Sequence, residues 1–199
     1  MKVLGITGSS GSGKSSVCNI IKKMHNIEII DADKVVKELQ DNKTTYYEKI
    51  VESFGQEILL DNELINRKIL AEKIFADENE KEKLDKLTFK YVVDEIRNRI
   101  EALRIENLEY IVVDAPTLIE ANMMDMFDKI IVVTAEESIK LDRICKRDEI
   151  SKEQAIKRLM SQHDDSFYIK YADFIISNDD ENIENKVKAV LEEIERENR

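Results

Sequence analysis

The stretch Gly8-Ser9-Ser10-Gly11-Ser12-Gly13-Lys14-Ser15 decides how the rest of this chain is interpreted. It matches the pattern G-x-x-x-x-G-K-[ST], follows the apolar segment Lys2–Thr7 and precedes a segment of helical periodicity that begins near Ser16. Four of the five glycines of the chain lie at positions 5, 8, 11 and 13. Because glycine allows unusual backbone angles and close approach to a ligand, this concentration marks the turn as special. The pattern predicts a P-loop, a turn whose backbone N–H groups bind phosphates.

The chemistry of such a turn assigns roles to its residues. Lys14 is expected to neutralise the β- and γ-phosphates of a nucleoside triphosphate, and Ser15 to offer its hydroxyl oxygen to Mg²⁺. The N-terminus of the following helix adds its dipole. A dinucleotide-binding fingerprint is excluded by register, because its third glycine would stand where the chain has Ser16. The predicted nucleotide-binding residues of this turn are Ser10, Gly11, Ser12, Gly13, Lys14, Ser15 and Ser16.

Alternating strand-like and helical patterns predict the fold class. Short apolar runs between polar turns are typical of buried parallel strands. They occur at Lys2–Thr7, Glu28–Asp31, Tyr110–Asp114, Lys129–Thr134 and Asp173–Ser177. Helical periodicity covers Ser16–Met24, Lys34–Leu39, Tyr46–Phe54, Asn66–Phe75, about Glu80 to Glu106, Ser138–Arg147, Ser151–His163 and Asn182–Asn198. The alternation predicts an α/β fold with three layers, in which helices cover both faces of a five-stranded parallel sheet.

The second and third expected strands are too far apart for a simple crossover. Residues 32–109 lie between them, whereas a crossover needs only a dozen or so residues. We interpret residues 34–107 as a helical insertion that binds the substrate, because α/β proteins bind ligands at the carboxyl ends of their strands. Residues 138–165 are predicted to form a lid. The 199 residues otherwise suit one domain, residues 1–199, with a sizeable core.

Composition excludes several classes of partner. The net charge is −11, and an acidic chain repels nucleic acid and anionic membranes. We therefore expect a small-molecule substrate, no nucleic acid and no membrane, since no apolar run approaches the ~20 residues of a membrane span. Cys18 and Cys145 fall in helical segments and indicate a reduced, cytoplasmic setting. His25 and His163 show no metal-ligand spacing. The expected assembly is a monomer or a small homo-oligomer.

Two aspartates at the end of the second expected strand are candidates for acid–base chemistry. Phosphoryl transfer to an alcohol benefits from a carboxylate that accepts or orients the hydroxyl proton. Asp31 and Asp33 lie two residues apart, so they share a face if the backbone is extended. Either of them is also a suitable N-cap for the next helix. The pattern leaves open which aspartate caps the helix and which faces the site.

Further candidates follow the third and fourth expected strands. Asp114 ends an Ile-Val-Val strand and resembles a Walker B acid, which helps to hold the metal directly or through water; Pro116 follows it. An ordinary strand-ending turn is the alternative. Arg143 and Arg147 lie one helical turn apart and share a face. Arg143 is predicted to clamp the transferring phosphoryl group as a lid closes.

The chain resembles the dephospho-CoA kinase family almost from end to end. The resemblance begins with Gly5-Ile6-Thr7-Gly8 leading into the P-loop and continues with Ile30-Asp31-Ala32-Asp33. Further matching pieces are Phe54-Gly55 with Ile58-Leu59, Leu64-Ile65-Asn66-Arg67 with Leu70 and Ile74-Phe75, and Pro116, Leu118 and Glu120. The last pieces are Leu141-x-Arg143, Arg147-Asp148, Gln162 and Ala172-Asp173-Phe174-Ile175-Ile176-Ser177-Asn178.

The resemblance implies a fold of the P-loop kinase type, with ATP as the phosphoryl donor and the ribose 3′-hydroxyl of dephospho-CoA as the acceptor. It implies Asp33 as the base, Arg143 near the triphosphate and Asn178 near the adenine of ATP. The predicted catalytic residues are therefore Lys14, Asp33 and Arg143. The predicted substrate-binding residues are Asp31, Asp33, Arg67, Asp114 and Pro116.

The sequence departs from the family pattern at two places. Relatives usually carry His-Pro after a leucine in the helical insertion, where this chain has Thr88-Phe89 after Leu87. Relatives usually have Pro-Leu-Leu-Phe-Glu, where this chain has Thr117 and Ile119. Both departures lie on the expected acceptor side, so a nucleoside or nucleoside monophosphate kinase of the same fold is the alternative. A nucleotide-binding module without enzyme activity is a weaker alternative, because a pure binder has little need for a base and a lid.

Overall fold

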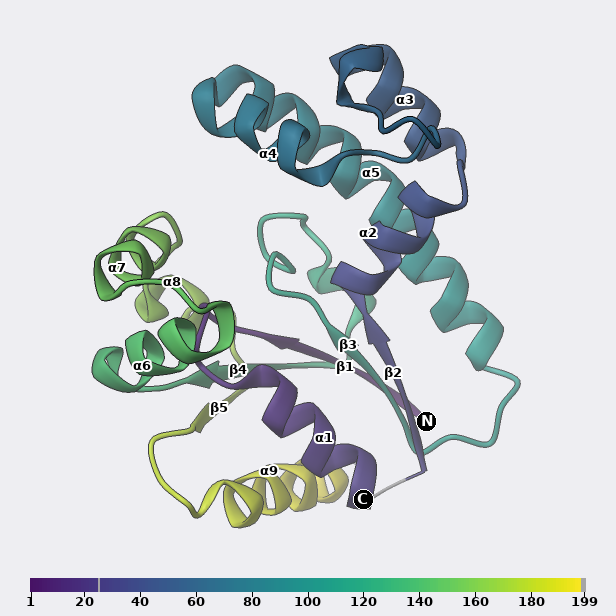
Figure 1. Ribbon diagram of the computed structural model, residues 1–199. Helices are drawn as coiled ribbons and strands as arrows, with labels where there is room; N and C mark the ends of the chain where they lie inside the picture. Colours follow the sequence, from purple (N-terminus) through teal and green to yellow (C-terminus); the bar gives the residue numbers. More distant parts are fainter. Residues whose placement is uncertain (25, 198–199) are drawn as a thin grey trace. The chain divides into compact units, whose positions relative to one another are not determined.

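The computed structural model describes residues 1–24 and 26–197 (Figure 1). The chain forms two compact units. The first, here called the sheet unit, comprises Met1–Ile30 and Ala102–Arg199, and the second, the helical unit, comprises Asp31–Glu101. The two units are described separately.

A five-stranded sheet forms the centre of the sheet unit, in the order β2-β3-β1-β4-β5. The strands are β1 (Lys2–Thr7), β2 (Ile27–Asp31), β3 (Tyr110–Asp114), β4 (Lys129–Thr134) and β5 (Phe174–Ser177). β1 pairs in parallel with both β3 and β4, and β4 pairs in parallel with β5. β2 and β3 begin at the same edge, where the Glu109 N–H donates to the Asn26 carbonyl at 2.8 Å. The central position of β1 places the turn that follows it between the ends of β3 and β4.

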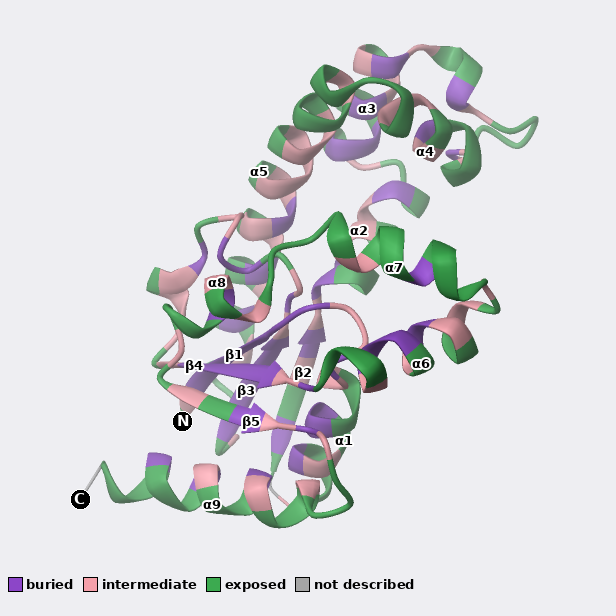
Figure 2. Cartoon of the chain, turned by 90° about the vertical axis from the view of Figure 1, so that its left-hand side faces the viewer, coloured by how far each residue is buried: buried purple, intermediate pink, exposed green. Residues whose placement is uncertain are grey.

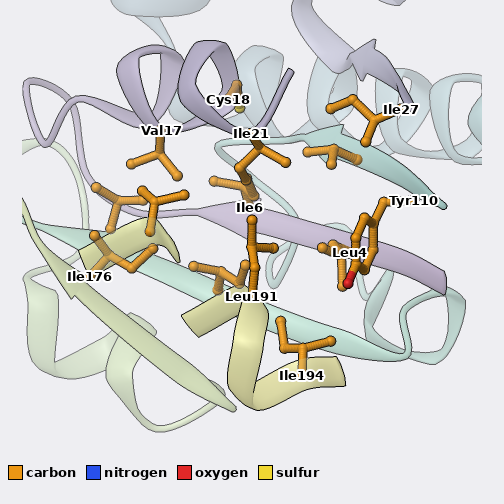
Figure 3. Packing of buried hydrophobic residues seen from close by; sticks show 14 residues of the cluster. Leu4, Ile6, Val17, Cys18, Ile21, Ile27, Tyr110, Ile176, Leu191 and Ile194 are labelled. Atoms are coloured by element: carbon orange, nitrogen blue, oxygen red, sulfur yellow. The ribbon is translucent and has the colours of Figure 1, made fainter. Parts of the chain in front are cut away.

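One face of the sheet packs against two helices of the sheet unit. α1 (Lys14–Met24) and α9 (Ile183–Arg196) bury Val17, Ile21 and Leu191 against it. Leu4 and Ile6 of β1 point into the same cluster, as Figure 3 shows. The alternation of side chains along a strand sends the intervening residues to the other face.

The opposite face is covered by residues that follow β3. An added Cβ on Gly5 would lie 2.6 Å from Leu118 and 2.9 Å from Phe127, so these side chains rest directly on the backbone of β1. This segment contains the short helix η2 (Met124–Met126). The strands β1, β3 and β4 are buried on both faces over most of their length (Figure 2). Apolar burial on both faces explains why they appear in the sequence as continuous apolar runs.

Three helices lie between β4 and β5. They are α6 (Glu137–Asp148), α7 (Lys152–Met160) and α8 (Asp165–Ile169). Ser151 and Gln154 form a capping box that starts α7. Leu141, Ile144 and Ala155 form a small buried cluster between α6 and α7.

The helical unit has a core of its own. It contains α2 (Ala32–Asp41), α3 (Thr45–Phe54), η1 (Gln56–Ile58), α4 (Arg67–Ala76) and most of α5 (Glu78–Leu103). Tyr46, Ile50, Phe54 and Ile58 are almost fully buried at its centre. Leu84, Leu87 and Tyr91 of α5 pack against this cluster.

The predicted α/β fold, with three layers and a five-stranded parallel sheet, is confirmed. The helix predicted at Ser151–His163 is three residues shorter at its C-terminus, because α7 ends at Met160 and Ser161 caps it. α8 was not predicted, because its five residues are too short to show a helical period. The other predicted elements agree with the structure within a few residues, and the predicted end at Asn198 lies outside the described residues. None of the described helices combines the length and apolar character that crossing a bilayer requires.

Candidate active site

The glycine-rich turn after β1 has the backbone geometry that its sequence predicts. Gly8, Gly11 and Gly13 have φ values of 139°, 80° and 92°, which side chains other than glycine rarely tolerate. An added Cβ on Gly11 would lie 2.6 Å from the Lys140 carbonyl oxygen, so α6 packs directly on the turn. α1 begins at Lys14, two residues before the predicted start at Ser16. Its N-terminus therefore directs the positive end of the helix dipole into the turn.

Lys14 and Ser15 lie at the first turn of α1. The Lys14 ammonium donates to the Gly8 carbonyl at 2.8 Å and lies 3.4 Å from the Ser9 carbonyl. This places a positive charge across the opening of the turn. Ser15 and Ser16 are exposed, so their hydroxyl groups are accessible to a ligand.

Arg143 and Asn178 contact the backbone of the same turn. Arg143 donates through Nη1 to the carbonyl oxygens of Gly11 and Ser12, at 3.2 Å each, and through Nη2 to the Asn178 carbonyl at 3.0 Å. The Asn178 side-chain amide donates to the Ser12 carbonyl at 2.9 Å, and Asn178 is only 4% exposed. Arg143 thus holds the backbone of the turn with its guanidinium group.

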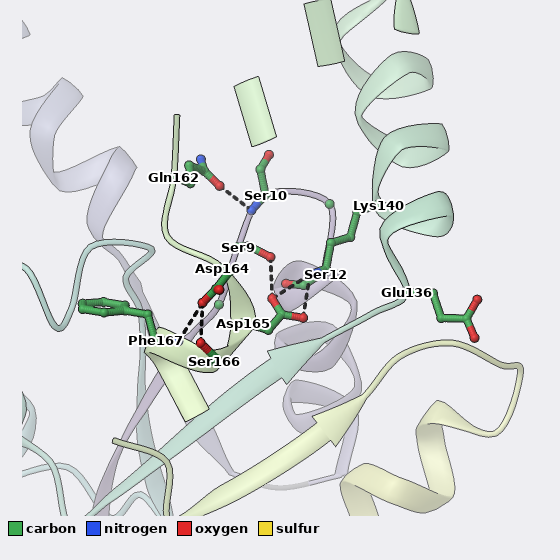
Figure 4. A network of polar contacts seen from close by, with 12 residues as sticks. Ser9, Ser10, Ser12, Glu136, Lys140, Gln162, Asp164, Asp165, Ser166 and Phe167 are labelled. Carbon is green, nitrogen blue, oxygen red and sulfur yellow. Dashed lines mark hydrogen bonds and ion pairs between the residues drawn. The ribbon is translucent and has the colours of Figure 1, made fainter. Parts of the chain in front are cut away.

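The first half of the turn is held by side chains that the sequence did not assign to the site (Figure 4). The Ser10 N–H donates to Gln162 Oε1 at 2.8 Å, and Arg147 Nη2 lies 3.2 Å from the Ser10 hydroxyl. The Ser9 hydroxyl donates to Asp165 at 3.0 Å, and Lys140 pairs with the same carboxylate. Arg143 and Arg147 lie one helical turn apart, and this spacing was the signal in the sequence that could have identified Arg147 as a residue of the site. No local pattern relates Lys140 or Asp165 to residues near the N-terminus.

A carboxylate links the ends of α6 and α7. Asp148 pairs with Arg147 at 2.8 Å and with Arg158 at 2.6 Å. The hydrogen bond from Arg147 is the main cause that lowers the pKa of Asp148, and Arg158 lowers it further. The positive charges of Arg147 and Arg158 are therefore partly neutralised.

A cavity of about 670 Å³ lies beside the first half of the phosphate-binding turn, at Ser9. Ser9, Lys140 and Asp165 contribute polar groups to its wall, and Ile156 and Leu159 of α7 contribute apolar ones. All residues that line this cavity belong to the sheet unit.

Asp114 and Pro116 lie next to the end of β1. Asp114 is the last residue of β3 and stands opposite Ile6 in the register of the sheet. The Thr7 hydroxyl donates to the Pro116 carbonyl at 3.1 Å. These two residues are therefore close to the point where the turn begins. Within residues 1–24 and 26–197, no group of three or more histidine, cysteine, aspartate or glutamate side chains is arranged to hold a metal ion.

The other predicted substrate-binding residues belong to the helical unit. The Asp31 side chain caps α2 by accepting from the Lys34 N–H at 3.0 Å, so Asp31 is the aspartate that caps the helix. Asp33 lies in the first turn of α2 and is exposed. Arg67 is half exposed and donates to Gln40 at 3.1 Å and to Asp41 at 2.8 Å.

The departure at Thr88 has a structural role within the helical unit. The Thr88 and Tyr46 hydroxyl oxygens are 2.7 Å apart, and Tyr46 is 1% exposed. A buried hydroxyl without a partner is costly. Burial raises the pKa of Tyr46. Thr88 therefore satisfies a polar group inside the core of this unit.

Comparison with known proteins assigns the chain to a family of kinases. Two curated relatives are named dephospho-CoA kinase. One, from Listeria innocua, is 36% identical over 195 residues, which cover 98% of this chain and 96% of the relative. The other, from Dehalococcoides mccartyi, is 34% identical and covers 89% of each chain.

Solved structures agree. A dephospho-CoA kinase from Campylobacter jejuni is 31% identical, with a TM-score of 0.71 and coverage of 99% of this chain and 98% of that chain. A Thermus thermophilus protein is 22% identical, with a TM-score of 0.80 over 98% of this chain and 97% of that chain, and is similar in fold. The sequence model described as dephospho-CoA kinase matches residues 2–184. The chain therefore belongs to the dephospho-CoA kinase family.

Proposed function

We propose that this kinase transfers the γ-phosphoryl group of ATP to the ribose 3′-hydroxyl of dephospho-CoA, which yields coenzyme A. The proposal rests on a phosphate-binding turn that follows β1 and is held by Arg143 and Asn178, in a chain of this family. Relatives of the same name align over nearly the whole chain, so the helical unit is included in the likeness.

Lys14 and Arg143 supply positive charge on the donor side. The Lys14 ammonium lies at the opening of the turn, where it neutralises the β- and γ-phosphates of ATP. Arg143 holds the turn in shape through Gly11 and Ser12. As charge develops on the transferring group, these fixed cations stabilise it without reorganisation.

The donor set of the site fits Mg²⁺. Ser15 presents an exposed hydroxyl, and Asp114 lies at the end of β3; both offer the oxygen ligands that Mg²⁺ prefers. Mg²⁺ is typically held by one or two protein groups together with substrate phosphates, so a dedicated cluster of protein ligands is not required. When bound, the ion would neutralise phosphate charge.

Asp33 is the proposed base on the acceptor side. Asp31 is engaged as the N-cap of α2, whereas the Asp33 carboxylate is exposed and available to a ligand. In the catalytic complex Asp33 accepts the proton of the 3′-hydroxyl as its oxygen attacks the γ-phosphorus. In this proposal the acceptor is bound by Asp31, Arg67 and Pro116.

The test is ADP release from MgATP with dephospho-CoA, with a no-acceptor control and a panel of nucleosides and nucleoside monophosphates. Dephospho-CoA is expected to stimulate release strongly. Asp33→Asn should lower kcat by about 10²- to 10⁴-fold, because it removes the base while preserving shape. Glu38→Gln, on the same helix, is the matched control and should stay within about twofold, since an amide still accepts from Arg99. Stimulation by a nucleoside instead would replace the proposed acceptor.

A further inference from the structure

Lys140 and Asp165 form an ion pair at the wall of the phosphate-binding turn. Lys140 is only 6% exposed, and its ammonium lies 2.6 Å from both carboxylate oxygens of Asp165. Lys140 belongs to α6 and Asp165 is the first residue of α8. A lysine this buried is unusual unless it is paired.

The pair reaches the turn at two points. The carboxylate of Asp165 accepts from the hydroxyl of Ser9, which is 2% exposed. The backbone of Lys140 packs on Gly11, where an added Cβ would lie 2.6 to 3.0 Å from it. The segment between Ser9 and Gly11 is therefore held at both ends by Lys140 and its partner.

Stability alone is a weak explanation for this arrangement. Removing two charges from water costs free energy that their attraction often fails to offset, and apolar side chains of similar size fill such sites at least as well. Directional bonds from a charged pair do, however, restrict Ser9 to one conformation. A preformed turn binds phosphates more tightly, because less ordering is required on binding.

We propose that Lys140 and Asp165 are positioning residues for nucleotide binding, which act through Ser9 to hold the turn in its phosphate-binding shape before ATP arrives. The proposal rests on the proposed function only in taking ATP as the ligand of the turn. Neither side chain touches the nucleotide in this proposal.

The test compares the affinity for MgATP with thermal stability in the full chain. Calorimetric titration would give Kd, and differential scanning fluorimetry would give Tm. The variants are Lys140→Met, Asp165→Leu, which removes the acceptor of the Ser9 hydroxyl, and the double variant K140M/D165L. Ser9→Ala and the double variant S9A/D165L complete the set. Lys146→Met, an exposed lysine on the same helix, is the matched control.

Each single variant of the pair is expected to bind MgATP about tenfold more weakly, the size of effect seen when groups that orient ligand-binding residues are removed. Lys140→Met should also lower Tm, because it leaves Asp165 without its cation. The double variant K140M/D165L carries no unpaired charge, so its Tm should recover toward the native value while its Kd remains about tenfold higher. KM for ATP should rise in these variants, whereas KM for dephospho-CoA should not.

Recovery of affinity together with Tm in the double variant K140M/D165L would show that the pair only supports the fold, and would overturn the proposal. Ser9→Ala tests the route, since it should weaken binding in the native background and add little to Asp165→Leu, in which the Ser9 hydroxyl has already lost its acceptor. Fully additive effects of these two changes would overturn the route through Ser9. If native protein does not bind MgATP, the proposed function itself fails. Native binding that the variants share unchanged defeats only this inference.

Discussion

The phosphate-binding turn and the acceptor-side residues of the helical unit are held in different ways. In the turn, bonds join residues far apart in sequence: Arg143 contacts Gly11 across 132 positions, and Asn178 contacts Ser12 across 166. In the helical unit, Asp31 bonds to a residue three positions away, and Arg67 is half exposed.

The difference suggests two ways of meeting a ligand. Buried, long-range hydrogen bonds around the turn allow it few alternative conformations, so it is preorganised for phosphate. Exposed side chains such as Asp33 keep their rotamer freedom until a ligand orders them. We therefore expect the turn to bind phosphate with little rearrangement, and the proposed acceptor-binding residues to become ordered when the substrate binds.

Among the changes that test this comparison, removal of the cation of the turn has the largest expected effect. Lys14→Ala should lower kcat by about 10²- to 10³-fold or more, because the β- and γ-phosphates lose a fixed charge at the opening of the turn. Steady-state ADP formation measures it, with Lys146→Ala as the control. If Lys14→Ala kept a third or more of native activity, the view of the turn as the donor site would be wrong.

Truncation of the helical core tests whether the two regions are separate in stability. Phe54 is 1% exposed, so Phe54→Ala should destabilise its unit by about 3–5 kcal/mol. Hydrogen exchange should then accelerate in residues 45–100 while β1 and β4 remain protected. Equal acceleration in β1 and β4 would mean that the chain unfolds as one cooperative unit and would break the comparison.

The cap of α2 should have a smaller effect. Asp31→Ala removes the acceptor for the Lys34 N–H and should cost about 1 kcal/mol in urea unfolding. Asp31→Asn keeps an oxygen acceptor, so it should cost only a few tenths of that. Equal losses in the two variants would mean that the negative charge, rather than the cap, contributes the stability.

The smallest effect is confined to alkaline pH. Burial, as the largest cause, and the nearby Glu195 together raise the pKa of Tyr110 in β3 to about 12. Because the folded state holds this proton more tightly than the unfolded state, the contribution of Tyr110 is complete below the unfolded pKa of about 10 and is lost as pH approaches 12.

Comparison of native protein with Tyr110→Phe in urea at pH 8, 10 and 11.5 tests this expectation. The native protein should lose stability relative to the variant above pH 10, since phenylalanine cannot ionise. Parallel curves for the two proteins would rule out this role for Tyr110.

Local patterns in the sequence were sufficient to predict the glycine-rich turn, the strands and the long helices. The glycines at 8, 11 and 13 marked a turn with positive φ, and the apolar runs marked strands buried on both faces. Periodicity located the long helices for the same reason, since a repeating apolar face records burial. Asp114 could be placed at the edge of the sheet, because the carboxyl ends of parallel strands meet there.

Only the tertiary structure decided how the turn is held and which aspartate caps α2. Asp31 and Asp33 are chemically equivalent in the sequence. The extended backbone at Asp31 makes it the N-cap of α2, whereas Asp33 lies within the first turn. The segment that follows β4 contacts the turn because β4 lies beside β1. This neighbourhood brings Lys140, Gln162 and Asp165 to the turn. Such contacts leave no periodic trace along the chain, because they depend on how distant segments pack and not on any local repeat.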